Sequence, residues 1–178
     1  MKSFVVRLMG TALVSLVTVS SAGAASLKTW DAVINKPSRF KVLTTFNSEA
    51  VLDKETGLVW QRDAGNGTPL RSGCGATQAW AAAAGYCCQE TIIGGRGGWR
   101  LPSLAEVFTL IDDTQASPTL PAGHPFSNVA GRYWTSTEGK TDPTNNAFNV
   151  NLDASNGEAE IPKSASRKVW CLRGPGPQ

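Results

Sequence analysis

The sequence predicts an α+β domain in which two helices pack on antiparallel strands. Two segments have helical periodicity, and short strand-like segments separated by Gly-containing turns lie before and after them. Strands and helices grouped in this way are typical of α+β domains. Four cysteines add the expectation that disulfides cross-link the domain.

The first 24 residues have the features of a secretory signal peptide. Lys2 and Arg7 supply a basic start, residues 8–19 are apolar, and residues 22–24 read Ala-Gly-Ala before Ala25. The apolar run is shorter than the roughly 20 residues that a membrane span requires. We therefore expect cleavage before Ala25, a secreted or periplasmic location, and no membrane span.

The rest of the chain is long enough for one domain. We expect an irregular lead-in at residues 25–38, the domain at 39–174 and a short tail at 175–178. Loss of Lys2 and Arg7 leaves 15 basic and 14 acidic residues, so the mature chain is nearly neutral. Nucleic-acid binding is not expected, because its affinity comes mainly from neutralising many phosphates.

The first half of the domain contains a predicted hairpin and a predicted helix. Residues 42–52 and 58–60 are strand-like and flank a Gly-containing turn at 53–57. Residues 77–88 are rich in alanine, and one side of the predicted helix carries Trp80, Ala84, Cys87 and Cys88.

The second helix has the clearest local signal. Glycines at 94–98 form a predicted loop that enters a short strand at 99–101, and Pro102 ends that strand. Ser103 and Glu106 have the spacing of a capping box, so a helix is expected to begin there. Its apolar stripe comprises Leu104, Val107, Phe108 and Ile111, and we expect Asp112-Asp113 to be a solvated helix end.

The chain is predicted to return to strands at residues 133–137, 147–152, 158–161 and 168–173. Asn156-Gly157 favours a hairpin turn within 153–157. Large aromatic side chains on predicted strands or on the buried stripe of a helix are expected in the core. These side chains are Trp60, Trp80, Trp99, Trp134 and Trp170.

Four blocks of the sequence resemble the Lcl C-terminal domain family, a bacterial domain of mostly unknown function named after a collagen-like adhesin. They are Asp-Lys-Glu-Thr-Gly-Leu-Val-Trp at 53–60, Gly-Trp-Arg-Leu-Pro with its capped helix from 98, Tyr-Trp-Thr-Ser-Thr at 133–137, and Val-Trp-Cys-Leu-Arg-Gly at 169–174. The blocks occur in the family's order. The Arg-Leu-Pro-Ser-x-x-Glu block also resembles that of formylglycine-generating enzymes, which implies their branch of the C-type-lectin-like fold. This fold hosts both enzymes and binding proteins.

The cysteines are Cys74, Cys87, Cys88 and Cys171, and in an exported chain they predict two disulfides. A bond between the neighbours Cys87 and Cys88 is geometrically poor, which leaves two connectivities. The resemblance implies that Cys88 pairs with Cys171 of the last strand, and Cys74 then pairs with Cys87.

No catalytic residue, metal site or cofactor is expected. Formylglycine-generating enzymes bind copper through two closely spaced cysteines near the C-terminus, where this chain has only Cys171. His124 is the only histidine and lies in a proline-containing loop. A histidine-based metal cluster is therefore excluded, and a serine–histidine triad is not expected.

Two loops, residues 114–131, which are rich in proline and glycine, and residues 138–146, are candidate ligand-binding regions. Oxygen atoms in the second loop could hold calcium or bond to a sugar. They belong to Glu138, Asp142, Asn145 and Asn146. The spacing matches no calcium-loop motif, and an ordinary solvated loop is the alternative interpretation.

Lys163, Arg167 and Lys168 form a predicted basic patch near the last strand. Resemblance to an adhesin domain that binds sulfated polysaccharides implies that this patch contacts an acidic glycan. The alternative is an exposed sheet edge protected by lysines.

We expect a secreted or periplasmic, non-enzymatic binding module, adhesin-like, with an extracellular glycan or protein as its ligand. Calcium is a candidate cofactor only through the loop at 138–146. The alternatives are an oxidase of the formylglycine-generating type and a structural or assembly subunit of the cell envelope.

Overall fold

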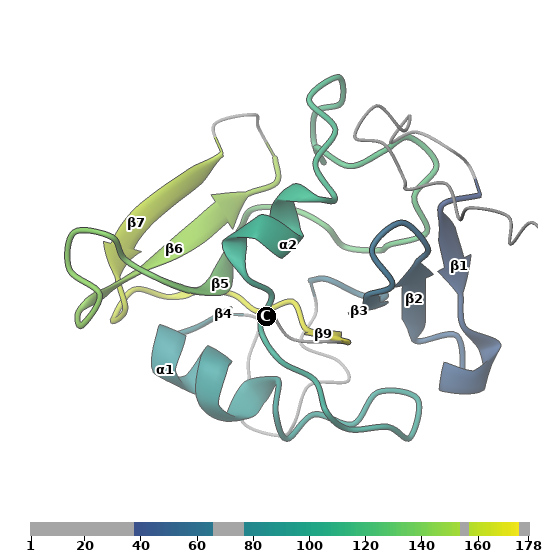
Figure 1. The fold of residues 1–178 in the computed structure, drawn as a ribbon, viewed down its shortest axis with the longest axis horizontal. Coiled ribbons are helices and arrows are strands. Elements are labelled where there is room, and N and C mark those ends of the chain that lie inside the picture. The colour runs from purple at the N-terminus through teal and green to yellow at the C-terminus, as the bar shows by residue number, and fades with distance from the viewer. Residues whose placement is uncertain (1–37, 66–76, 154–156, 175–178) are drawn as a thin grey trace, which may run out of the picture. The chain divides into compact units, whose positions relative to one another are not determined.

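The computed structural model describes residues 38–65, 77–153 and 157–174, which belong to one compact unit spanning Val33–Gln178 (Figure 1). The predicted signal peptide, the lead-in up to residue 37, Cys74 and the tail at 175–178 lie outside the described residues. No helix in the described part of the chain has the length and apolar character needed to cross a bilayer.

The first sheet has four antiparallel strands in the order β1, β2, β3, β9. They span Phe40–Val42, Ala50–Asp53, Val59–Gln61 and Leu172–Arg173. The predicted hairpin is confirmed as β2–β3, and Gly57 in its turn has a φ of 75°, which glycine adopts readily. The strand predicted over 42–52 is interrupted. A 3-10 turn, η1 (Thr44–Phe46), and left-handed backbone at Asn47 and Ser48 separate β1 from β2.

The second sheet has five strands in the order β4, β8, β5, β6, β7. They span Thr77–Gln78, Arg167–Lys168, Arg132–Glu138, Asn146–Asn151 and Glu158–Pro162. Neighbours are antiparallel except β5 and β8, which pair in parallel through Tyr133 and Lys168. β7 ends level with the end of β5, whereas β8 pairs near the start of β5, so the chain runs back along the sheet before it forms β8. In Figure 1, β5–β7 and β1–β2 lie on opposite sides of α2.

The first helix is shorter than predicted. It comprises α1 (Trp80–Ala82) and a π-helical turn, η2 (Ala83–Cys87). It begins later than predicted because Thr77 and Gln78 form strand β4, which pairs with β8. Trp80 is only half-buried, in contrast to the prediction. Its indole N–H bonds to the carbonyl oxygen of Thr135 at 2.8 Å, which holds the ring at the edge of the core.

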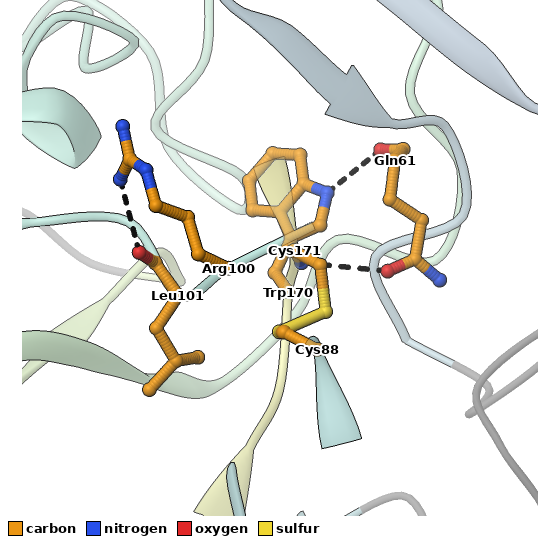
Figure 2. Close-up of a disulfide and its surroundings, with 6 residues drawn as sticks. All are labelled: Gln61, Cys88, Arg100, Leu101, Trp170 and Cys171. Carbon is orange, nitrogen blue, oxygen red and sulfur yellow. Dashed lines mark hydrogen bonds between the residues drawn. A yellow bond between two sulfur atoms is a disulfide. The ribbon is translucent and has the colours of Figure 1, made fainter. Parts of the chain in front are cut away.

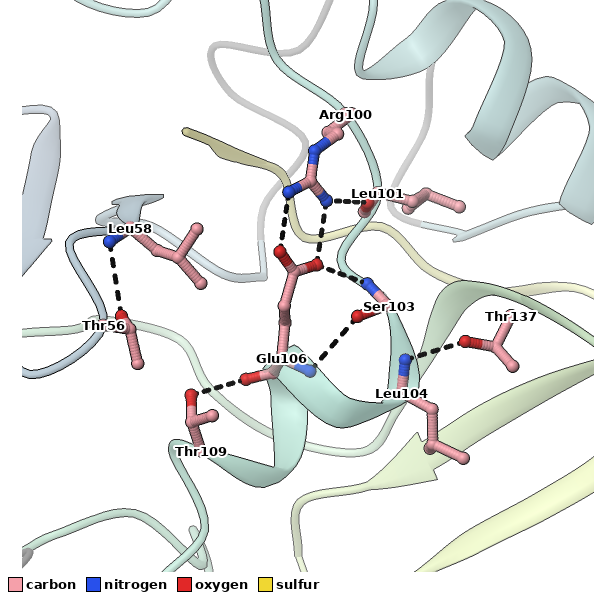
Figure 3. Close-up of polar contacts among 9 residues, drawn as sticks. All are labelled: Thr56, Leu58, Arg100, Leu101, Ser103, Leu104, Glu106, Thr109 and Thr137. Atoms are coloured by element: carbon pink, nitrogen blue, oxygen red, sulfur yellow. Dashed lines mark hydrogen bonds and ion pairs between the residues drawn. The ribbon is translucent and has the colours of Figure 1, made fainter. Parts of the chain in front are cut away.

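The second helix, α2 (Leu104–Phe108), begins at the predicted capping box (Figure 3). Ser103 Oγ accepts a hydrogen bond from the amide of Glu106 at 3.3 Å, and the Glu106 carboxylate accepts one from the amide of Ser103 at 2.7 Å. Arg100 donates two further hydrogen bonds to this carboxylate, at 2.8 and 2.6 Å. Burial raises the pKa of Glu106, but the contacts with Arg100 and Ser103 outweigh it and the net pKa is lowered.

The end of α2 differs from its prediction. The helix ends at Phe108, whose side chain is 40% exposed, so Phe108 is not part of the buried stripe. Asp112 is not solvated, with only 7% of its surface exposed. Its carboxylate accepts hydrogen bonds from the amide and hydroxyl of Thr114 at 3.0 and 2.7 Å, which forms a local turn.

Two predicted strands are shorter in the structure. The segment 99–101 makes a single bridge, from Arg100 to Leu172, because Pro102 has no N–H with which to extend the pairing. The segment predicted as one strand at 168–173 is divided between β8 and β9, which belong to different sheets. Residues 169–171 carry the chain from one sheet to the other.

The predicted disulfide between Cys88 and Cys171 is confirmed and lies at this crossing (Figure 2). The two Cα atoms are 5.5 Å apart, and both residues are completely buried. Gln61 on β3 accepts the indole N–H of Trp170 on its backbone oxygen at 2.7 Å and the amide of Cys171 on its side-chain oxygen at 3.4 Å. The disulfide therefore ties the end of η2 to the segment at 169–171 that joins the two sheets.

The core contains the four tryptophans predicted on strands. At most 1% of each side chain is exposed, for Trp60, Trp99, Trp134 and Trp170. One unpredicted polar contact is also buried. Arg39 donates two hydrogen bonds to Asp53, at 2.8 and 2.7 Å, and one to the carbonyl oxygen of Thr109 at 2.6 Å. This ion pair attaches the start of the domain to the β2–β3 turn and to the end of α2.

Candidate functional site

The loop at 138–146 joins β5 to β6 and folds over the side chain of Glu160 on β7. The Glu160 carboxylate accepts hydrogen bonds from the amides of residues 140–142 at 3.1–3.3 Å and from the side-chain amide of Asn146 at 3.3 Å. It also accepts the hydroxyl of Thr141. These hydrogen bonds, led by that of the Thr141 hydroxyl, lower the pKa of Glu160 to about 2.

The other predicted ligand residues of this loop also contact one another. Asp142 accepts hydrogen bonds from the side chain and the backbone amide of Asn145 at 2.9 and 3.1 Å, and these bonds lower the pKa of Asp142. Lys163 forms an ion pair with Glu138 at 2.8 Å and donates to the carbonyl oxygen of Pro143 at 2.7 Å. A ligand that used these groups would have to replace the hydrogen bonds they already make.

Lys163 also lies over the ring of Trp80, with its Nζ atom 4.2 Å from the ring centroid. This is a cation–π contact, and it connects the loop at 138–146 to α1. Within the described residues, no three His, Cys, Asp or Glu side chains are grouped so that they could hold a metal ion. Calcium binding at this loop therefore stays a prediction from the sequence.

The structure separates the three residues of the predicted basic patch. Lys163 faces Trp80, as described above. Arg167 and Lys168 are successive residues of β8, so their side chains project to opposite faces of the strand. Arg167 donates to a neighbouring backbone oxygen, whereas Lys168 lines a pocket.

This pocket has a volume of about 370 Å³ and lies where the predicted binding loop at 114–131 meets β8. Small-molecule sites usually have volumes of ~300–1,000 Å³. The rings of His124 and Phe126 are stacked in its lining, with centroids 5.9 Å apart. The full lining comprises Gly65, Pro118, His124, Phe126, Asn128, Val129, Ala130 and Lys168.

Long-range hydrogen bonds fix one wall of the pocket. Asn128 has a left-handed backbone with φ of 58°, and its side chain donates to both carboxylate oxygens of Asp63 at 3.0 Å. Gly65 approaches so closely that a Cβ atom there would lie 2.3 Å from the carbonyl oxygen of Asn128. The hydroxyl of Tyr133 donates to that same oxygen at 3.3 Å and accepts the amide of Ala130 at 3.1 Å.

The titratable groups in and beside the pocket have shifted pKa values in two cases, Tyr133 and His124. Burial, together with the nearby carboxylates, raises the pKa of Tyr133 to about 12, so its hydroxyl remains a neutral donor at pH 7. Partial burial lowers the pKa of His124, and the backbone of Phe126 offsets this only in part. Lys168 has its Nζ atom 5.8 Å from the centroid of the Tyr133 ring, and it forms no ion pair within the described residues.

The model of the Lcl C-terminal domain family matches residues 49–173. This range contains the disulfide, the pocket and every strand of the two sheets except β1. The chain belongs to the Lcl C-terminal domain family. No curated protein matches it. The disulfide of this Lcl C-terminal domain fits an extracellular or periplasmic location, because such bonds persist in oxidising compartments.

Several residues that shape the two loop regions of this Lcl C-terminal domain carry no sequence signal of their role. Glu160 is one of two glutamates on an ordinary strand, and Asp63 lies 65 residues from Asn128. Tyr133 is part of a family block, but its hydroxyl contacts depend on where the loop at 128–130 lies. The sequence held one signal that Arg167 and Lys168 do not share a face: successive side chains of a strand alternate between its two faces.

Proposed function

We propose that this Lcl C-terminal domain is an exported, non-enzymatic binding module that holds its ligand in the pocket between residues 118–130 and Lys168. The observation that carries the proposal is Lys168, which lines a preformed pocket and forms no ion pair with any residue that the structure describes. A charged group without an internal partner is available to a ligand, whereas the polar groups of the loop at 138–146 are engaged with one another.

The proposed ligand is an acidic group on an extracellular glycan or protein. Lys168 supplies the positive charge, and its hydrogen bonds to an anion are stronger than those between neutral groups. The partly exposed ring of His124, which stacks on the buried ring of Phe126, provides a face against which a sugar ring or an aromatic side chain can pack. The adhesin after which the family is named supports an adhesin-like role.

A binding function is favoured over an oxidase because the residues that an oxidase or hydrolase would use are engaged elsewhere or lack the required partners. The sulfur atom of Cys171 is bonded to Cys88 and is not a free thiolate for a copper ion. In the described residues, no hydrogen bond joins the His124 ring to a serine or a carboxylate.

We further propose that the fold belongs to the formylglycine-generating-enzyme branch of the C-type-lectin-like superfamily. The support is the capped helix α2, which begins at the Arg-Leu-Pro-Ser-x-x-Glu block. This helix contacts β5 and β6 of the second sheet and contributes Val107 to the hydrophobic core. This branch contains binders as well as enzymes, so the fold by itself does not decide the function.

An array of neutral and acidic glycans and acidic peptides, probed with the oxidised protein with and without calcium, tests the function. We expect acidic members to bind, and Lys168→Gln to weaken that binding about tenfold or more, because a charge-assisted hydrogen bond is lost. Lys163→Gln is the matched control, since Lys163 lies outside the pocket lining. Undiminished binding by Lys168→Gln, or an equal loss in both variants, would contradict the proposal.

A further inference from the structure

A second group of cations gathers around Phe46, which is not a lining residue of the pocket. The guanidinium carbon of Arg96 lies 4.8 Å from the centroid of the Phe46 ring, and that of Arg173 lies 5.7 Å from it. These arginines come from distant parts of the chain, a glycine-rich turn and the last strand, β9. Both guanidinium groups are therefore directed to one aromatic ring.

Arg96 is positioned by a tight turn that rests on η1. Ile93 and Arg96 exchange backbone hydrogen bonds of 3.1 and 3.0 Å, and the two glycines between them have φ values of 57° and 73°. A Cβ atom on Gly94 would lie 2.4 Å from the Cα atom of Phe46. The turn can therefore approach Phe46 this closely only with glycine at position 94.

The other components of the cluster are held by the core and the first sheet. Arg173 is paired with Val59 in the β3–β9 ladder. The Phe46 ring packs edge-on against the buried ring of Trp99, with centroids 6.3 Å apart, and the Trp99 indole N–H donates to the carbonyl oxygen of Arg96 at 2.6 Å. The backbone around both arginines is thus fixed before any ligand arrives.

The two positive charges of this cluster lie close together. The distance between the two guanidinium carbons cannot exceed the sum of their distances to the centroid of the Phe46 ring. That sum is about one Debye length at 0.1 M salt (~10 Å), so salt does not fully screen the two charges from each other. In the described part of the chain neither arginine forms an ion pair. Glu49, the acidic residue of this segment, is exposed and directs a carboxylate oxygen to the amide of Gly94 at 2.6 Å.

We infer that Arg96, Arg173 and Phe46 form a binding site for an oxyanion, namely a carboxylate, sulfate or phosphate group. Guanidinium groups present pairs of N–H donors whose geometry matches such groups, and two of them offer more than one paired contact. The aromatic ring holds the arginines in place without neutralising them. This site shares no residue with the pocket, so the inference does not rest on the proposed function.

Nuclear magnetic resonance of the arginine Nε–Hε groups tests the site directly. Sodium sulfate, phosphate and acetate are titrated separately into the folded protein, with sodium chloride added so that ionic strength stays constant. We expect Arg96 and Arg173 to shift together along one saturable curve, and the anion with the lowest Kd identifies the oxyanion class. Arg132, an exposed arginine on β5, serves as the reference and should show no saturable shift.

Variants then separate a shared site from a structural contact. Arg96→Gln should weaken sulfate binding measured at Arg173 about tenfold, whereas Arg132→Gln should leave it unchanged. Arg173→Gln, measured at Arg96, provides the reciprocal test if one variant fails to fold. Shifts that never saturate, that appear equally at Arg132, or that persist at one arginine after loss of the other would overturn the inference. An unchanged sulfate response with a lower unfolding midpoint would show that the arginines serve only the fold.

Discussion

The loop at 138–146 is rich in polar side chains and the segment at 118–130 is rich in proline and apolar residues, and the structure uses their polar groups in opposite ways. In the first, the carboxylate of Glu160 collects the loop amides, and Lys163 neutralises Glu138. In the second, the long-range contacts between Asp63, Asn128 and Tyr133 shape a wall, and Lys168 in the pocket lining forms no ion pair with the residues described here.

This difference shows that a high density of oxygen ligands in a sequence does not by itself indicate a binding site. Buried or closely packed polar groups tend to satisfy one another, and a satisfied group gains little by exchanging its partner for a ligand. The segment with fewer charged residues is therefore the better candidate. Four measurements can break or sharpen this comparison.

Loss of the disulfide should have the largest effect, because both regions depend on the same framework. Replacing Cys88 and Cys171 together by alanine opens a loop with a sequence separation of 83 residues. We expect the free energy of unfolding to fall by about 4 kcal/mol, because the unfolded chain gains conformational freedom. Urea unfolding of the oxidised proteins provides the measurement.

The control is Lys41→Gln, at an exposed position on β1, which should change stability by no more than about 0.5 kcal/mol. Ligand binding by the folded fraction of the cysteine variant should be retained. A loss of stability below about 1 kcal/mol would show that the disulfide is not what holds η2 to the crossing segment at 169–171.

The capping box should have a smaller effect. Ser103→Ala removes the acceptor for the Glu106 amide and should reduce the free energy of unfolding by about 1 kcal/mol. Ser103→Asp restores an acceptor and serves as the control. Ligand binding at the pocket and the hydrogen bonds of the loop at 138–146 should both be unchanged. An unchanged unfolding midpoint in Ser103→Ala would mean that the amide of Glu106 finds another partner.

Acid should loosen the loop at 138–146 through protonation of Glu160. The pKa of Glu160 is about 2 in the folded protein, below its ordinary value of 4.5. Its stabilising contribution is therefore complete above pH 4.5 and is lost as the pH falls through about 2. Hydrogen exchange of the amides at 140–142 should accelerate over this range, and Glu160→Gln should remove the transition.

Glu158→Gln, on the same strand, is the matched control and should leave the exchange profile intact. A carboxyl group at residue 160 that titrates near its ordinary value would show that the loop does not depend on this hydrogen-bond network.

The sequence predicts those parts of the domain that depend on local rules. The capping box at Ser103, the β2–β3 turn with Gly57, the four core tryptophans on strands and the family-implied pair Cys88–Cys171 are all confirmed. Each has a signal within a few residues or in the resemblance.

The parts that the sequence does not predict depend on tertiary contacts. The segment at 168–173 reads as one strand, but residues 169–171 are needed to cross between the sheets. The prediction that Trp80 is buried is wrong because contacts with Lys163 and Thr135 hold its ring at the edge of the core. The expected basic patch fails as a unit because neighbouring residues of a strand face opposite ways. Whether a polar group has a partner is decided by residues that are distant in sequence, such as Asp63 and Glu160.

The central claim is that the ligand enters the pocket of Lys168 and not the loop at 138–146. A direct test is a nuclear magnetic resonance titration of the 15N-labelled domain with glucuronate, an acidic sugar, and with glucose as the neutral counterpart. We predict saturable shifts of the amides of Asn128, Ala130 and Lys168 with glucuronate, much weaker shifts with glucose, and none at residues 140–146. Saturable shifts confined to residues 140–146, with the pocket amides unmoved, would contradict the account.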